Sequence, residues 1–369
     1  MHDSLNVIDD KKIRDNFRIQ IIIDSNCNLA CDYCVLLYKN QIYKEERAVS
    51  KQVLDAYIDF FSNNYDDVLK YYKEITITFF GGEPLLSKDK ILYLIERLYK
   101  YSKINFVIHT NGILLDRKFI KSLELFPKDR YSFIVSIDGD LELMLKYRLK
   151  SKKQFYQIVF GLKLLRDNKI KFLISPSIMK PNSKDLFRNY QYLYNLKPNG
   201  IIINPVTAIY NYRETDSTKE IVKGIKLFFD YLKSKHNLSD KEIINLFGLP
   251  LNITQFKDFL KFGINITGDI DGTVHAMSFA WKGFDDGGTY TKEDLKGITL
   301  GNVLFNVEQL KKNILRYDLY TDEKIWEIAY RQQRKWTMPD WDVQNILASM
   351  ILRYFKDYYK SNKNLKRCE

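Results

Sequence analysis

Three of the four cysteines in this 369-residue chain lie within eight residues of one another. Cys27, Cys31 and Cys34 follow the spacing Cys-x3-Cys-x2-Cys, and no fourth candidate ligand stands nearby in the sequence. A cubane iron–sulfur cluster normally takes four thiolates, so three of them leave one iron open. An open coordination position distinguishes a catalytic metal site from a closed structural one. The spacing therefore predicts chemistry at an iron.

Two other interpretations of the cysteines stay open at this point. A zinc site would need a fourth ligand, which Cys368 or a histidine could supply only if folding brought it close. The clustering could also be a coincidence of composition. Cys368 stands second from the end of the sequence and is interpreted as an exposed thiol. His109 and His275 lie in strand-like segments, and a packed strand histidine is favoured over a catalytic base for both.

A second candidate segment is Gly81-Gly82-Glu83, which follows an apolar run over residues 74–80. Two glycines allow the backbone to approach a ligand closely and expose its polar groups. Glu83 places a carboxylate where an ammonium group could be held. Such a segment alone is more often a turn than a site. Because the segment lies at the same edge of the predicted sheet as the three cysteines, the binding interpretation is favoured.

These segments are positioned by a regular alternation of strand-like and helix-like stretches. Strands are expected over residues 17–24, 74–80, 104–110, 131–137, 171–179 and 200–206, and helices over 50–62, 88–101, 154–167 and 185–196. Such alternation predicts a parallel sheet with right-handed crossovers. The fold class is thus α/β, a partial (β/α)6 TIM-like barrel with a C-terminal α+β extension. The polar segments follow strands, at the sheet edge where such folds bind ligands.

After residue 206 the pattern changes. Helices are expected over 218–235, 240–247 and much of 307–360, with hairpins in the Gly- and Asp-rich stretch 263–305. The chain is therefore divided into three parts. These are an N-terminal segment over 1–16, the barrel over 17–212 and a C-terminal domain over 213–369.

The order of the motifs closely resembles that of the radical S-adenosylmethionine (SAM) enzymes over residues 17–206. The resemblance implies that the three clustered cysteines hold a [4Fe–4S] cluster and that SAM chelates its open iron. It also implies that the backbone of Gly81 and Gly82, together with the Glu83 carboxylate, holds the methionine ammonium. One electron would then cleave SAM into methionine and a 5′-deoxyadenosyl radical that abstracts a hydrogen atom from the substrate.

The resemblance extends to the ends of the later strands. Ser136 and Asp138 stand in a segment similar to the family's Ser-x-Asp-Gly, whose Ser and Asp contact the SAM ribose. Arg148 ends a Lys-Tyr-Arg run that resembles one in peptide-modifying members, where the arginine lies near the SAM carboxylate. The other residues expected to line the SAM pocket are Tyr33, Thr110, Asn111, Ser175, Ser177, Asn204 and Val206.

The C-terminal part resembles the SPASM and twitch domains of peptide-modifying members. Gly272 and Asn302 keep scaffold positions of those domains, while Phe262 and Met277 stand where the relatives have cysteines. This implies a degenerate domain without auxiliary clusters. The alternative is a hairpin region that resembles such a domain by chance.

The predicted function is hydrogen abstraction from a ribosomally synthesised peptide, leading to a cross-link, a thioether or an epimerisation. One alternative is a radical SAM enzyme that acts on a small molecule or activates a partner enzyme. Another is a non-enzymatic iron–sulfur or zinc binding module, against which the SAM-pocket segments argue. The expected partners are a precursor peptide and an electron donor such as flavodoxin or ferredoxin.

Composition and charge limit the partners and the cellular compartment that are expected. The net charge is +12, from 58 Lys and Arg against 46 Asp and Glu, and is interpreted mainly as solvated helix surface. No nucleic-acid-binding signature accompanies it, so no nucleic-acid partner is expected. The N-terminus has no apolar secretory segment, and no apolar stretch is long enough to span a bilayer. Few cysteines and no disulfide pattern favour the reducing cytoplasm.

Overall fold

A computed structural model describes residues 14–34, 48–205, 215–248, 266–276, 299–316, 347 and 350–358. Within these residues, six strands lie side by side, each parallel to the next, and the partial (β/α)6 barrel is confirmed. In their order across the sheet they are β1 (Arg14–Asp24), β2 (Tyr72–Gly81), β3 (Ile104–Thr110), β4 (Tyr131–Val135), β5 (Phe172–Ile174) and β7 (Gly200–Ile201).

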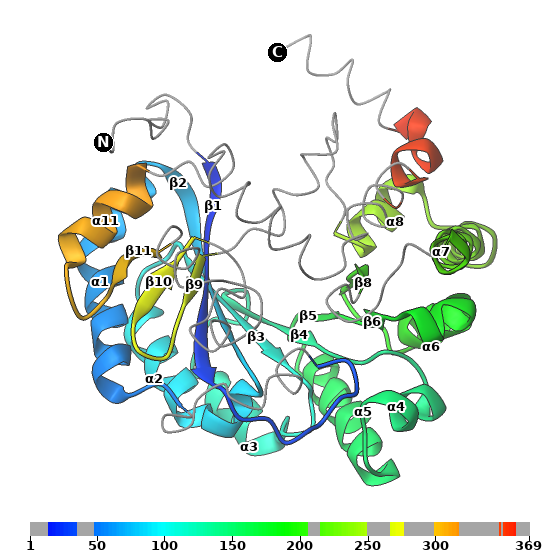
Figure 1. The fold of residues 1–369 in the computed structure, drawn as a ribbon, viewed down its shortest axis with the longest axis horizontal. Helices are drawn as coiled ribbons and strands as arrows, with labels where there is room; N and C mark the ends of the chain where they lie inside the picture. The colour runs from blue at the N-terminus through cyan, green and yellow to red at the C-terminus, as the bar shows by residue number, and fades with distance from the viewer. Residues whose placement is uncertain are drawn as a thin grey trace.

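Helices cover the outer face of this curved sheet, as Figure 1 shows. They include α1 (Lys51–Leu69), α2 (Lys88–Leu98), α3 (Arg117–Leu123), α4 (Leu141–Tyr147), α5 (Lys152–Asp167) and α6 (Leu186–Asn195). In β3 and β4, buried residues alternate with half-buried ones, as expected when opposite faces meet different surroundings. The buried set packs against the helices, as in the edge-to-face contact between Phe119 of α3 and Phe133 of β4. The half-buried set faces the other side, here called the concave face.

The fifth and sixth strands are shorter than the sequence predicted, because each divides in two. Ser175 still donates its N–H to Val135 O (2.9 Å), but Pro176 has no N–H with which to continue the ladder. The chain leaves the main sheet and forms β6 (Ser177–Ile178), which pairs with β8 (Asn204–Pro205) in a separate two-stranded sheet. Ser177 and Asn204 thereby become direct neighbours in register.

The C-terminal part adds three strands to the β1 edge of the main sheet. β9 (Ile266–Gly268) runs parallel to β1, and β10 (Thr273–His275) and β11 (Thr299–Asn302) follow as antiparallel neighbours. α11 (Val307–Arg316) lies beside α1 in Figure 1, where Lys311 forms an ion pair with Asp67. The strands expected in this region thus extend the barrel sheet. The predicted boundary at 212 falls outside the described residues, so the division into domains stays a prediction.

Two further helices, α7 (Thr215–His236) and α8 (Asp240–Leu246), lie at the far end of the barrel next to α6. Aromatic side chains join them, with Phe228 of α7 in contact with Tyr190 of α6 and with Phe247. Both helices agree with the sequence-based prediction to within three residues at each end. Among the described residues, no helix combines the length and apolar character that a membrane span requires.

Candidate active site

The cysteine segment begins at the carboxyl end of β1 and is fastened there by the end of β2. Gly82 donates its N–H to Asp24 O (2.8 Å), and Glu83 donates its N–H to Asn26 O (2.7 Å). A Cβ atom on Gly82 would lie 2.3 Å from Asn26 O, so only glycine allows this approach. The glycines were expected to admit a ligand. In the structure they admit the backbone that leads into Cys27.

Gly82→Ala is expected to destabilise the protein by about 3 kcal/mol, because the added methyl group meets rigid backbone rather than a side chain that can move. Gly248→Ala is a matched control, since Gly248 has φ +56° but nothing within 4 Å of an added Cβ, and backbone strain alone costs about 1 kcal/mol. Urea unfolding of the metal-free, reduced protein measures both. Equal losses in the two variants would contradict the steric explanation.

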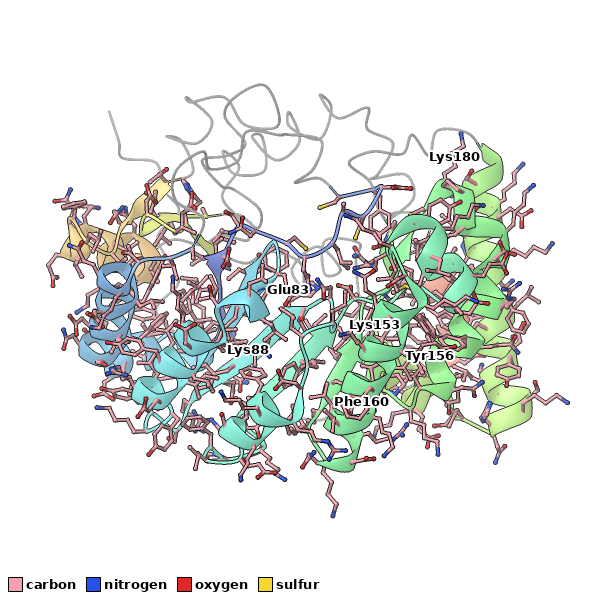
Figure 2. All side chains as sticks on the ribbon, turned by 90° about the horizontal axis from the view of Figure 1, so that it is seen from below. Glu83, Lys88, Lys153, Tyr156, Phe160 and Lys180 are labelled. Carbon is pink, nitrogen blue, oxygen red and sulfur yellow. The ribbon has the colours of Figure 1, made fainter. Side chains whose placement is uncertain are left out.

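The Glu83 carboxylate is completely buried and is surrounded by donors from its own chain. Thr110 Oγ1 (2.7 Å) and Leu85 N (2.9 Å) donate to Oε1, and Asn111 N (2.7 Å) donates to Oε2. Burial raises the pKa of Glu83 to about 6, and these donors partly offset the rise. Figure 2 shows Glu83 in the middle of the molecule, away from Lys153 and Phe160 on α5. Glu83 thus ties the end of β2 to the end of β3, and its contact with a methionine ammonium stays a prediction.

The first cysteine is positioned by Asn111, at the end of β3. Asn111 Nδ2 donates to Asn28 Oδ1 (2.7 Å) and lies 3.8 Å from Cys27 Sγ. Asn111 Oδ1 accepts the N–H of Ile113 (3.1 Å), which fixes the orientation of the side-chain amide. Asn28 was not singled out from the sequence, because its partner lies 83 residues away. Thr110 and Asn111 thus support the cysteine segment, and no pocket role is needed to explain their hydrogen bonds.

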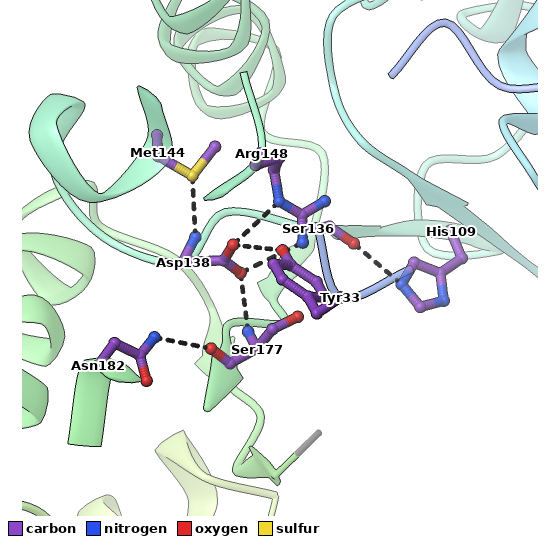
Figure 3. Close-up of polar contacts among 8 residues, drawn as sticks. All are labelled: Tyr33, His109, Ser136, Asp138, Met144, Arg148, Ser177 and Asn182. Atoms are coloured by element: carbon purple, nitrogen blue, oxygen red, sulfur yellow. Dashed lines mark hydrogen bonds and ion pairs between the residues drawn. The ribbon is translucent and has the colours of Figure 1, made fainter. Parts of the chain in front are cut away.

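The other end of the cysteine segment is held by a buried hydrogen-bond network around Asp138, drawn in Figure 3. Arg148 donates from Nε to Asp138 Oδ2 (3.0 Å) and from Nη2 to Oδ1 (3.2 Å). The Tyr33 hydroxyl donates to Oδ2, and Ser177 N donates to Oδ1 (2.8 Å). Four donors match the lone-pair capacity of a carboxylate. Donors from the protein thus occupy the Asp138 carboxylate, and its contact with the SAM ribose stays a prediction.

Charge and burial shift the pKa values of Arg148 and Tyr33, two of the residues around Asp138. Burial disfavours the Arg148 charge, but Asp138 and Tyr33 outweigh it, and the pKa of Arg148 stays well above its usual value. Burial also raises the pKa of the Tyr33 phenol well above its usual value, so Tyr33 remains a donor at neutral pH. Arg148 was expected near a SAM carboxylate or on a helix surface. The structure pairs it with Asp138 and leaves it 8% exposed, which contradicts the helix-surface alternative, while the SAM contact stays a prediction.

Ser136 follows β4 and stands on the concave face beside His109. Its Oγ lies 3.3 Å from His109 Nε2, and the His109 ring lies 5.0 Å from that of Phe80. Burial, with the Arg148 charge as a smaller cause, lowers the pKa of His109 to about 4. The imidazole is therefore neutral at ordinary pH. This agrees with the packed histidine predicted from the sequence.

His109 should make the protein less stable in acid. Its folded pKa of about 4 lies below the ordinary value of 6.5, so the unfolded chain binds a proton first as pH falls. Stability is retained above pH 6.5 and is lost between pH 6.5 and 4, by at most about 3 kcal/mol. His109→Gln should remove this loss. Unfolding at pH 7 and pH 4.5 measures it, and an equal acid response in both proteins would contradict the assignment.

The three clustered thiols are free, with Cys27 exposed, Cys34 half-buried and Cys31 buried. Burial raises the pKa of the Cys31 thiol to about 12. The described residues contain no group of three or more His, Cys, Asp or Glu placed to hold one metal ion. Zinc ligands converge on one ion, whereas cluster thiolates bind separate irons. A set of three thiolates fits a [4Fe–4S] cluster that keeps one iron open.

The remaining predicted residues are distributed as follows. Ser175 and Ser177 are both buried, and Asn204 pairs with Ser177 across the small sheet. His275 lies buried in β10, with Nδ1 3.2 Å from Thr299 Oγ1, as expected of a strand histidine. The predictions that fall outside the described residues are those for Val206, Phe262, Met277 and Cys368.

Comparison with known proteins identifies the domain that carries this site. Residues 21–186 match the model of the radical SAM superfamily. The prediction of a [4Fe–4S] cluster and SAM as cofactors is confirmed at the level of that superfamily. All three cysteines, Gly81 to Glu83 and Arg148 lie inside the matched range.

Two curated relatives and one solved structure show where the similarity extends. A serine-type anaerobic sulfatase-maturating enzyme of Bacteroides thetaiotaomicron is 30% identical over 40% of this chain and 35% of its own. The radical SAM cyclopropyl synthase TigE of Paramaledivibacter caminithermalis is 26% identical over 58% and 46%. The chain thus spans less than half of either relative. Native anSMEcpe with bound AdoMet and Kp18Cys peptide has the same fold, with a TM-score of 0.63 at 16% identity over 94% of this chain and 99% of that one.

Proposed function

We propose that this chain, which carries a radical SAM domain over residues 21–186, cleaves SAM reductively and abstracts a hydrogen atom from a peptide substrate. The observation that carries the proposal is the placement of the Cys-x3-Cys-x2-Cys segment. Gly82 and Glu83 fasten its start to the carboxyl end of β2, and Tyr33 fastens its end to Asp138. Ligands bind at this edge in parallel α/β folds.

The residues of this edge divide the binding tasks among them. Cys27, Cys31 and Cys34 would hold the cluster. The carbonyl groups of Gly81 and Gly82, together with the Glu83 carboxylate, would accept from a methionine ammonium. Ser136 is half-buried on the concave face, and its hydroxyl would form a hydrogen bond with the SAM ribose. Ser177 and Asn204, joined by β6 and β8, would border the adenine.

With a cluster and SAM bound, one electron would cleave SAM into methionine and a 5′-deoxyadenosyl radical. The electron would come from a flavodoxin or a ferredoxin. Transfer of one hydrogen atom from substrate carbon gives 5′-deoxyadenosine and a substrate radical, which balances the step. The chain's own residues orient the reacting groups and exclude water.

A peptide is the favoured substrate because of the kinds of protein that this chain resembles. The sulfatase-maturating relative is named for acting on another protein, and the structure of anSMEcpe holds a peptide. The additional strands β9 to β11 widen the barrel sheet beyond the six strands of the radical SAM barrel. A small-molecule substrate is the second candidate, and the same assay distinguishes the two.

The test is anaerobic reconstitution with iron and sulfide, followed by SAM and dithionite. We expect 5′-deoxyadenosine and methionine in equal amounts, and faster turnover with the natural substrate. Adding synthetic peptides encoded beside the gene tests the peptide class. A formed cluster without 5′-deoxyadenosine would overturn the proposed chemistry. Acceleration by a small metabolite but by none of the peptides would overturn the peptide assignment.

A further inference from the structure

Three polar side chains form a row across the strands at the β1 edge of the barrel. Gln20 of β1 pairs in register with Thr267 of β9 on one side and with Thr78 of β2 on the other. Residues in register on neighbouring parallel strands point to the same face of the sheet. Gln20, Thr267 and Thr78 therefore share one face.

That face is the concave one. Gly268, the next residue after Thr267, pairs with Ile21 and so points to the opposite side. A Cβ atom on Gly268 would lie 2.0 Å from the Tyr57 hydroxyl, so α1 covers the Gly268 side. The row consequently faces away from α1. Phe80, on the same face as Thr78, follows it by two residues, so the row lies about 7 Å deeper than the level of Phe80 and His109.

Two members of the row keep a buried oxygen that has no hydrogen-bond partner among the residues described by the structure. These atoms are Gln20 Oε1 and Thr267 Oγ1, and Gln20 is 8% exposed while Thr267 is fully buried. A buried polar group without a partner lowers stability. Two such groups stand side by side, next to the half-buried Thr78. Orphaned polar atoms of this kind point to a partner that binds from outside the chain.

We propose that Gln20 and Thr267 form a subsite that binds an amide group of the substrate. The Gln20 carbonyl oxygen can accept an amide N–H, and the Thr267 hydroxyl can donate to the amide C=O. An amide supplies this donor and acceptor pair, whether it belongs to the peptide backbone or to an Asn or Gln side chain. The inference rests on the proposed peptide substrate and adds the chemical group that is recognised below the SAM site.

The test uses capped amino acids as probes of the reconstituted protein with SAM bound. N-acetylglutamine N-methylamide carries a backbone and a side-chain amide, and N-acetylmethionine N-methylamide carries backbone amides alone. Saturation-transfer NMR reports binding of each probe. We expect signal in the natural protein and at least a fivefold loss in Gln20→Leu and in Thr267→Val. Loss for both probes identifies a backbone amide, and loss for the glutamine probe alone identifies a side-chain amide.

Tyr131→Phe is the matched control. The Tyr131 hydroxyl is also buried, with no hydrogen-bond partner in the described part of the chain, but Tyr131 pairs with Phe106 on the helix-covered face. Its removal should leave probe binding unchanged. Thr267→Val and Tyr131→Phe should both keep or raise the melting temperature, by about 2 °C, since each removes an orphaned hydroxyl. A lowered melting temperature for Thr267→Val would mean that the hydroxyl has a structural role and would contradict the subsite.

The outcomes separate this inference from the proposed chemistry. Probe signals that are absent in the natural protein, or equal in all variants, overturn the subsite even if 5′-deoxyadenosine forms normally. Absence of 5′-deoxyadenosine from a loaded protein overturns the chemistry, whatever the probes show.

Discussion

Cys31→Ala is expected to abolish both cluster assembly and formation of 5′-deoxyadenosine. Two thiolates would remain for a cluster that takes three from the protein, and a vacant corner exposes a second iron to solvent. Cys31 is also the most buried of the three, at 8% exposure, so a thiol dissolved in the solvent cannot take its place. We therefore expect loss of activity below detection rather than a partial decrease.

The measurement combines iron and sulfide content, the visible absorption of the reconstituted protein and product formation with dithionite. Cys368→Ala is the matched control, because it removes the fourth cysteine of the sequence and leaves the Cys-x3-Cys-x2-Cys segment intact. It should assemble the cluster and turn over at the natural rate. Turnover by Cys31→Ala would contradict the ligand assignment. Bound zinc in place of iron after anaerobic purification would support the zinc interpretation instead.

The positions of the strands were predictable because apolar residues recur with a period of two in the sequence. Runs such as residues 74–80 alternate between faces, and the structure shows one face buried against helices and the other half-buried. The breaks at Pro176 and before Asn204 were harder to predict. A proline ends a ladder only if the missing N–H would have been used, and this depends on which strand lies alongside.

The roles of individual polar groups were less predictable than the location of the site. Glu83 resembles a ligand-binding carboxylate, but its donors Thr110 and Asn111 lie 27 and 28 residues away. Asp138 looks available in the sequence, yet Tyr33 reaches it from 105 residues away. Sequence patterns place such groups at one sheet edge. Only the folded chain determines which of them use their hydrogen-bonding capacity on one another.

Arg148→Met is expected to lower the free energy of unfolding strongly, because Arg148 is buried beside Asp138. It removes both hydrogen bonds from the guanidinium to Asp138 and leaves that carboxylate buried with half of its donors. Breaking a buried pair by removing one partner typically costs about 3–5 kcal/mol, because an uncompensated charge remains. Tyr33 donates to the same carboxylate. Loss of Arg148 should therefore also weaken the positioning of Cys34, which follows Tyr33, and slow assembly of the iron–sulfur cluster.

Arg188→Met is the matched control, because Arg188 pairs with Asp140 on the surface and is 58% exposed. That pair is solvated, so its removal should leave the unfolding midpoint unchanged within error. Urea unfolding of reduced, metal-free protein compares the two variants. Similar midpoints for Arg148→Met and the natural protein would contradict a buried ion pair.

A double variant distinguishes the uncompensated charge from lost packing as the cause. If the buried Asp138 charge is what destabilises Arg148→Met, then adding Asp138→Asn should restore part of the stability, because the neutral amide costs less to bury. If lost packing of the arginine side chain is responsible, the second change should add to the loss. Iron content measured on the same three proteins then shows whether Cys34 is positioned through Tyr33. A recovered fold that still assembles the iron–sulfur cluster slowly would assign that role to the hydrogen bond between Tyr33 and Asp138.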